Sequence, residues 1–159
     1  MAKKATKAAD NNFYKARMEA ASFNDSFNSR EGAAEILGID RTRLARIELG
    51  SLSPYPEEVL LMSDAYNAPE LNNYFCSRMC PLGCQTVTPA ELLHLDRLTI
   101  RILSALGNAE FIQETIIEIV KDGKVTEDEQ PQVDKILTAL EKISKAAIEM
   151  KLWVEKNIK

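Results

Sequence analysis

Apolar side chains along most of this chain recur every three or four positions, the spacing that places them on one face of an α-helix. Runs in which Val, Ile or Thr alternate with polar residues, which would indicate β-strands, are missing. We therefore expect an all-α protein. In the first half of the chain, the pattern predicts short helices near residues 11–23, 30–37, 41–48, 56–66 and 69–76.

The residues that flank these apolar runs are suited to begin and end helices. Ser29 and Asp40 are good N-caps for the second and third helices, because their side-chain oxygens accept bonds from free backbone N–H groups. Gly38 falls between these two helices, where a tight turn favours a residue that tolerates positive φ. Gly50 follows the third helix, and Pro56 suits the first turn of the fourth.

The second half of the chain is dominated by two apolar series with alternating steps of three and four residues, the period of helices that pack side by side. The first series is Leu95, Leu98, Ile102, Ala105, Ala109, Ile112, Ile116 and Ile119, and the second is Val133, Ile136, Leu140, Ile143, Ala147, Met150 and Val154. Thr126 and Glu129 form a capping box before the second helix. The joint DGKV is short, which predicts a long antiparallel helical hairpin, with Gly107-Asn108 as a kink or break in its first helix.

Large apolar residues also lie outside these two series: Leu92, Ile100, Leu103, Leu106, Phe111, Ile117, Val120, Leu137, Ile148 and Trp153. An isolated hairpin would leave many of them in water, at a loss of about 25 cal/mol per Å². We expect a second copy of the chain to cover them, giving a homodimeric bundle of the coiled-coil type across a twofold axis. The alternative is that the hairpin folds back on the first half of its own chain.

These patterns divide the chain into four parts. Residues 1–10 are a flexible basic tail, and residues 11–76 form a five-helix head. Residues 77–88, which contain Pro81 and Gly83, form a cysteine-containing linker, and residues 89–159 form the hairpin that dimerises.

Composition and charge fit a globular protein that contacts phosphate groups at one end. Apolar residues make up 45% of the chain and charged residues 28%. The net charge of −4 hides an asymmetry. Residues 1–55 hold nine Lys or Arg and seven Asp or Glu, a net +2, and the remainder holds eleven and seventeen, a net −6. A basic first segment on an acidic body is compatible with nucleic-acid binding at that segment.

The second and third predicted helices form a candidate helix-turn-helix. Leu44 and Ile47 are spaced to anchor the third helix to a core, which leaves Arg41, Thr42, Arg43 and Arg46 facing outward. A short helix held in this way can enter the major groove of DNA. Its arginines can donate paired hydrogen bonds to guanine or neutralise phosphates.

The segment SREGAAEILGIDRTRLARIELGSLSP, residues 29–54, resembles the lambda-repressor-like family of regulators, also called the Cro or XRE type. The matching positions are Ala34, Leu37-Gly38-Ile39, Asp40, Ile47-Glu48-Leu49-Gly50 and Pro54. The resemblance implies a five-helix domain that binds double-stranded DNA as a dimer, with a structural role for Glu48. It places the DNA-facing positions at Ser29, Arg30, Arg41, Thr42, Arg43 and Arg46.

The segment departs from the family pattern in two places. Arg30 stands where Gln is common, which puts the usual contact at the start of the second helix in doubt. Gly32-Ala33 replaces a polar-Leu pair, and a glycine inside a helix costs about 1 kcal/mol.

The favoured function is that of a sequence-specific DNA-binding transcriptional regulator, a repressor, that acts as a homodimer. One alternative is a helical protein-interaction module, such as an antitoxin-like or anti-repressor partner, that binds another protein through the hairpin. A second alternative is a cysteine-based metal or redox sensor. It would use Cys76, Cys80 and Cys84, although their C-x3-C-x3-C spacing differs from the C-x2-C pairs typical of zinc sites.

Other classes of function find little support in the residues. The chain has one His, no paired nucleophile motif and no phosphate-cradling glycine loop, so we expect no enzyme activity and no cofactor. No signal peptide or membrane-spanning apolar run is recognisable, and the odd, clustered cysteines do not suggest a disulfide framework. We therefore expect a cytoplasmic protein without membrane contact.

Overall fold

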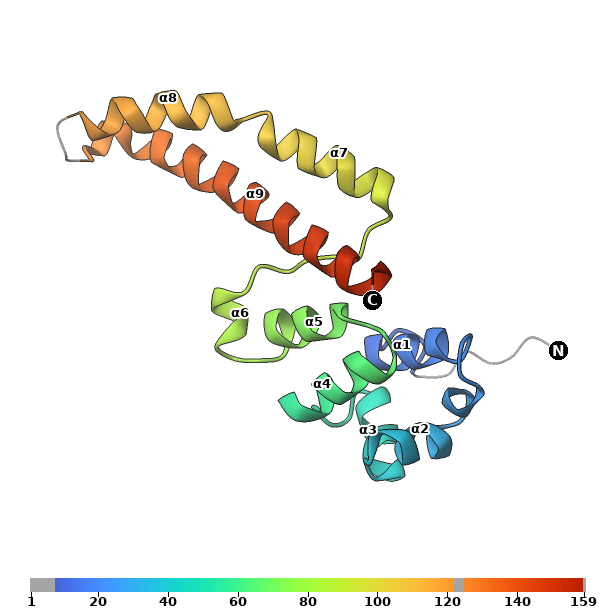
Figure 1. Ribbon diagram of the computed structural model, residues 1–159. Coiled ribbons are helices and arrows are strands. Elements are labelled where there is room, and N and C mark those ends of the chain that lie inside the picture. Colours follow the sequence, from blue (N-terminus) through green and yellow to red (C-terminus); the bar gives the residue numbers. More distant parts are fainter. Residues whose placement is uncertain (1–7, 122–124, 159) are drawn as a thin grey trace. The chain divides into compact units, whose positions relative to one another are not determined.

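The computed structural model describes residues 8–121 and 125–158, which are all-helical and contain no strand. The chain forms two compact units, Met1–Pro89 and Ala90–Lys159 (Figure 1). Of the predicted basic tail, Lys3, Lys4 and Lys7 lie outside the described residues, while Ala8 is buried within the first unit. Residues 122–124 of the predicted joint also lie outside the described part.

The first unit consists of short helices separated by turns. In chain order they are α1 (Asn12–Ala20), the 3-10 turn η1 (Asp25–Asn28), α2 (Arg30–Leu37), α3 (Arg41–Glu48), α4 (Pro56–Ala65), α5 (Glu70–Arg78) and α6 (Gly83–Thr86). The bounds of α2 and α3 match the predicted ranges, and α1, α4 and α5 differ from theirs by a few residues at their ends.

The predicted caps of α2 and α3 are confirmed. Ser29 Oγ accepts a hydrogen bond of 3.0 Å from the Gly32 N–H, and Asp40 Oδ1 accepts one of 2.8 Å from the Arg43 N–H. Gly38 ends α2 in the left-handed region, with φ 64°, as the turn between the two helices requires. These local interactions fix where α3 begins.

Buried apolar side chains from α1 to α5 form the core of the first unit. The largest are Phe13, Phe27, Leu44, Ile47, Met62, Tyr66 and Leu71. Phe27 meets Tyr66 edge to face, with ring centroids 5.1 Å apart. Leu44 and Ile47 are 0% and 1% exposed, so α3 is held by the two residues that the sequence assigns to that role.

Gly32 lies where α2 passes close to η1. A Cβ atom added at Gly32 would lie 2.4 Å from the backbone oxygen of Ser26, which is closer than van der Waals contact allows. Glycine lowers the stability of α2, but the close approach of η1 requires it at this position, and the sequence alone does not reveal that contact.

The stretch for which the sequence predicts a linker, residues 77–88, lies within the first unit. It contains the last residues of α5 and the short α6, which pack together. A Cβ at Gly83 would lie 2.1 Å from the Cys76 backbone oxygen, so glycine permits this approach. Asn73 Nδ2 donates a 3.0 Å hydrogen bond to the Thr88 carbonyl, which ties the end of the stretch back to α5.

The second unit contains α7 (Leu95–Leu106), α8 (Ala109–Val120), the 3-10 turn η2 (Glu127–Glu129) and α9 (Gln130–Asn157). Both α7 and α8 pack along α9, which runs back beside them (Figure 1). The chain breaks its helix at Gly107-Asn108, between α7 and α8. The capping box is present, with Thr126 N donating to Glu129 Oε2 over 2.8 Å.

The two predicted apolar series differ in how well they are buried. In the first series, Leu98, Ala105, Ile112 and Ile119 are buried, whereas Leu95, Ala109 and Ile116 are exposed. The second series is wrong at Leu140, Ala147, Met150 and Val154, which are exposed, and Ala139, Ala146, Glu149 and Leu152 are buried in their place. The buried positions lie one or two residues before the predicted ones, so the buried face of α9 is rotated away from the predicted series.

Substitution of Gly32 and Gly107 by alanine is predicted to change stability in opposite directions. Gly32→Ala destabilises the first unit by about 1–3 kcal/mol, because its methyl group meets the Ser26 backbone. Gly107→Ala is neutral or stabilises by about 0.5–1 kcal/mol, because φ is −59° and the added atom makes ordinary contacts.

Urea unfolding measures both effects separately. All four tyrosines lie in the first unit and the single tryptophan, Trp153, lies in the second, so tyrosine fluorescence and tryptophan fluorescence report on different units. A Gly32→Ala variant whose first unit is as stable as the parent would contradict the close approach.

Candidate nucleic-acid interface

Helix α3 has one face in the core and another in solvent. Leu44 and Ile47 occupy the inner face, and Arg41, Thr42 and Arg46 are exposed on the outer face. With eight residues at 1.5 Å each, the helix is about 12 Å long. A helix with its side chains is about 10–12 Å across, which fits the DNA major groove, about 12 Å wide.

Arg43, which the sequence places on the outer face of α3, is engaged by the start of α4. Its Nε donates to Glu58 Oε1 over 2.5 Å and its Nη2 donates to Glu58 Oε2 over 2.9 Å. The guanidinium also lies over the Tyr55 ring, with Cζ 4.2 Å from the centroid. Arg43 therefore joins α3 to α4.

This contact shifts the titration of both partners. The hydrogen bond from Arg43 lowers the pKa of Glu58, and the backbone N–H of Tyr55, which donates over 2.7 Å, acts in the same direction. The hydrogen bond with Glu58 raises the pKa of Arg43. Because Glu58 accepts the Tyr55 N–H at the start of α4, a single carboxylate both satisfies this backbone group and fixes Arg43.

Ser29 and Arg30, the other two predicted site residues, have structural partners. The Ser29 hydroxyl caps α2, as described above. Arg30 Nε donates to Glu48 Oε2 over 2.6 Å, and the Arg30 side chain keeps 32% of its surface exposed. Of the six predicted positions, therefore, Arg41, Thr42 and Arg46 are the most open to a ligand.

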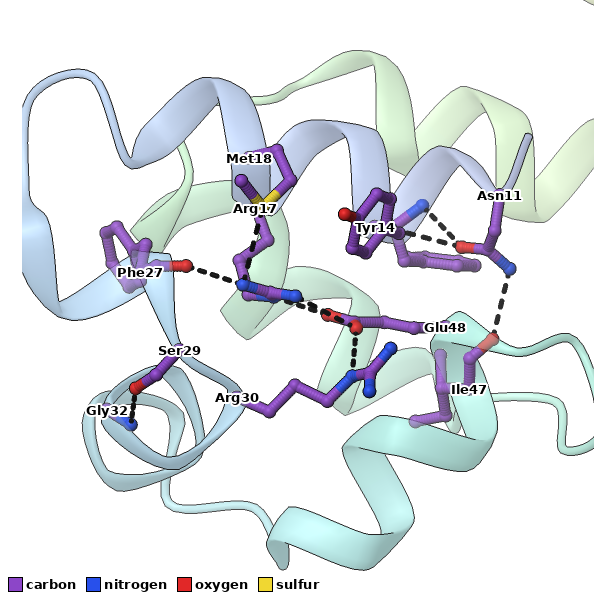
Figure 2. Close-up of polar contacts among 11 residues, drawn as sticks. Asn11, Tyr14, Arg17, Met18, Phe27, Ser29, Arg30, Gly32, Ile47 and Glu48 are labelled. Atoms are coloured by element: carbon purple, nitrogen blue, oxygen red, sulfur yellow. Dashed lines mark hydrogen bonds and ion pairs between the residues drawn. The ribbon is translucent and has the colours of Figure 1, made fainter. Parts of the chain in front are cut away.

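A buried ion-pair network joins the helices that position α3 (Figure 2). The Glu48 carboxylate is fully buried. It accepts hydrogen bonds from Arg17 Nε over 2.6 Å and from Arg17 Nη2 over 3.1 Å, in addition to the bond from Arg30 Nε. Arg17 also donates from Nη1 to the Phe27 carbonyl over 2.6 Å. The network therefore connects α1, η1, α2 and the last residue of α3.

Sequence reasoning assigned Glu48 a structural role but missed Arg17. The signal was present, because Phe13, Ala16 and Ala20 form an apolar stripe on α1, and Arg17 stands in the middle of it. A single cation on an apolar helical face requires a buried partner of opposite charge, which Glu48 provides.

Asn11 makes a second connection to α3. Its Oδ1 accepts from the N–H groups of Phe13 and Tyr14 and so caps α1, while its Nδ2 donates to the Ile47 carbonyl over 3.0 Å (Figure 2). The start of α1 is thereby fastened to the end of α3.

The three cysteines are free thiols, with Cys76 and Cys80 half-buried and Cys84 exposed. Cys80 Sγ accepts from the Gly83 N–H over 3.4 Å. Among the described residues, no group of three or more His, Cys, Asp or Glu side chains is arranged to hold a metal ion.

Within the described ranges, no helix is both long and apolar enough to span a membrane. Comparison with protein-family models found no match, and no curated protein or solved structure matches the chain significantly.

Loss of the Glu48 charge is predicted to destabilise the first unit strongly. Glu48→Gln leaves the buried Arg17 without a counter-ion, and breaking one partner of such a pair costs about 3–5 kcal/mol. Urea unfolding followed by tyrosine signals measures the loss. The exposed Glu35→Gln should stay within about 0.5 kcal/mol of the parent. Equal stability of Glu48→Gln and Glu35→Gln would show that the network is not needed.

The Arg43–Glu58 contact predicts a loss of stability in acid. The pKa of Glu58 is lower in the folded chain than its ordinary value of 4.5, so its contribution is complete above that pH and is lost as the pH falls below it. Glu58→Gln should therefore flatten the acid side of the profile of unfolding free energy against pH. Profiles of parent and variant that run parallel below pH 4.5 would contradict this assignment.

Proposed function

We propose that the chain is a sequence-specific DNA-binding transcriptional regulator, a repressor, that acts as a homodimer through a helix-turn-helix formed by α2 and α3. The observation that carries the proposal is the division of α3 into two faces. Leu44 and Ile47 are buried, while Arg41, Thr42 and Arg46 are exposed to solvent, and the diameter of an α-helix fits the major groove.

In this mechanism, the outer face of α3 reads base edges and the start of α2 contacts the DNA backbone. Arg41 and Arg46 are suited to paired hydrogen bonds with guanine, and Thr42 offers a hydroxyl and a methyl group. Ser29 and Arg30 lie at the N-terminus of α2, where backbone N–H groups and positive charge favour a phosphate. Arg43 acts by positioning, because Glu58 holds its guanidinium.

The resemblance of residues 29–54 to the lambda-repressor-like family supports the same function. Several of the residues that carry this resemblance have a clear structural task in the chain. Gly38 makes the left-handed turn, Asp40 caps α3, and Glu48 binds Arg17 and Arg30. These tasks are those expected of a frame that orients a recognition helix.

One observation favours a protein-interaction module as a second candidate function. The second unit exposes many large apolar side chains, including Ile100 at 68% and Leu103 at 65%. Surfaces of this kind bind other proteins more often than DNA. A protein partner and a DNA site are not mutually exclusive, because the two surfaces belong to different units.

Selection of bound duplexes from a random DNA pool tests the proposal. A regulator of this type should enrich a near-palindromic sequence whose two half-sites are about one helical turn apart. The affinity for the enriched duplex should fall with added salt, since phosphate contacts release counter-ions. Failure to enrich any sequence, together with copurification of another protein, would favour the interaction module.

Substitution of the exposed arginines of α3 is predicted to weaken DNA binding without affecting folding. Arg41→Ala and Arg46→Ala should each cost about 1–3 kcal/mol of binding free energy for the selected duplex. Arg43→Ala should in addition lower the stability of the first unit, because it removes the contact with Glu58. Fluorescence anisotropy with labelled duplex and thermal unfolding measure the two quantities.

The control for these variants is Arg97→Ala, an exposed arginine on α7 of the second unit. It removes the same charge from the chain and should leave binding unchanged. If Arg41→Ala and Arg46→Ala bind the duplex like Arg97→Ala, the outer face of α3 is not the reading surface.

A further inference from the structure

The helix pair formed by α7 and α9 has two flanks of opposite chemistry. On one flank, a hollow of about 210 Å³ is lined by Arg101, Ser104, Ala105, Lys142 and Lys145. Beside it, Arg101 and Lys145 pair with the buried Glu149 carboxylate. On the other flank, a hollow of about 240 Å³ is lined by Ile102, Ala105, Leu106, Ile143, Ala146, Ala147 and Met150, with no polar side chain among them.

Exposed apolar residues continue this second flank in both directions along the helices. Leu140 and Val154 lie seven residues before and after Ala147, and Leu95 lies seven residues before Ile102, so each shares a helix face with a residue of the hollow. Leu95, Leu140 and Val154 are 48%, 43% and 37% exposed. We call this surface the apolar flank: Leu95, Ile102, Leu106, Leu140, Ala147, Met150 and Val154.

The shape of the apolar flank is suited to a copy of itself. Three small residues, Ala105, Ala146 and Ala147, line the hollow, and the larger Leu106 and Met150 beside them are 52% and 38% exposed. A patch that holds both a recess and protruding side chains can pair with itself across a twofold axis, each copy filling the recess of the other. A charged partner would gain nothing from this surface, because none of its seven residues carries a charge.

We propose that a second copy of the chain packs on the apolar flank, so that α7 and α9 of two chains form a four-helix layer. This makes specific the homodimer of the proposed function, and it does not depend on whether the first unit binds DNA. The opposite flank of the helix pair, where Arg101 and Lys145 form ion pairs with Glu149, stays outside the contact between the two chains. The side chains that the coiled-coil pattern places in the seam of the hairpin, such as Met150 and Val154, belong instead to the contact between chains.

Sedimentation equilibrium of the full chain without DNA tests the proposal. Over a roughly hundredfold range of concentration, the parent should approach twice the mass of one chain. Its self-association should persist at high salt, because the surface is uncharged, whereas DNA binding weakens. Failure of dimerisation and failure of DNA binding are thus measured independently.

Two variants place a charge in the middle of the apolar flank, and one matched variant places it elsewhere. Leu106→Lys and Ala147→Lys alter exposed residues, so each chain should fold with unchanged helical circular dichroism, while its dimer dissociation constant rises at least about 100-fold. Ile100→Lys alters a more exposed residue on the outer face of α7 and should dimerise like the parent.

Three results would overturn the proposal. If the parent chain stays monomeric over the whole concentration range, the apolar flank is covered by the chain's own first unit or by another protein. Leu106→Lys and Ala147→Lys chains that dimerise like the parent would place the contact elsewhere. An Ile100→Lys chain that dissociates as they do would assign dimerisation to the outer face of α7.

Discussion

The arrangement of the first unit depends on a carboxylate buried where α1, α2 and α3 meet. Glu48 ends α3 and is fully buried, and it receives hydrogen bonds from Arg17 on α1 and Arg30 on α2. A buried charge is tolerated only when it is paired and hydrogen-bonded, so each of these helices is constrained to the position that satisfies the others. Apolar contacts of Leu44 and Ile47 bury the inner face of α3, and the ion pairs of Glu48 fix the orientation of α3 relative to α1 and α2.

This constraint determines how the arginines of the unit are used. Arg17 and Arg30 serve the Glu48 network, and Arg43 serves the start of α4 through Glu58 and Tyr55. Arg41 and Arg46 remain exposed on α3. The same side chain type therefore builds the frame at some positions and is left available to a ligand at others, and the difference is set by which acidic residue lies within reach.

Much of the first unit could be predicted from the sequence because its signals are local. Helix caps such as Ser29 and Asp40 act on N–H groups three residues away, and Gly38 acts on its own backbone. The partners of Arg30 and Arg43 could not be predicted, because Glu48 and Glu58 are 18 and 15 residues away and only the packing of helices brings them together. For this reason, the six predicted DNA-facing positions include Arg30 and Arg43, whose guanidinium groups are held by carboxylates. In the second unit, the heptad rule predicts the buried Leu98 and Ala105 of α7, but the buried positions of α9 precede the predicted ones by one or two residues.

We propose above all that the buried network around Glu48 orients the outer face of α3 toward a DNA duplex. A titration of the isotopically labelled chain with a selected duplex, followed by backbone amide chemical shifts, tests it most directly. The account predicts that the largest shifts fall on α3 and on the first turn of α2, with smaller shifts in the core residues beneath them. Shifts confined to the second unit, or shifts spread evenly over the chain, would contradict it.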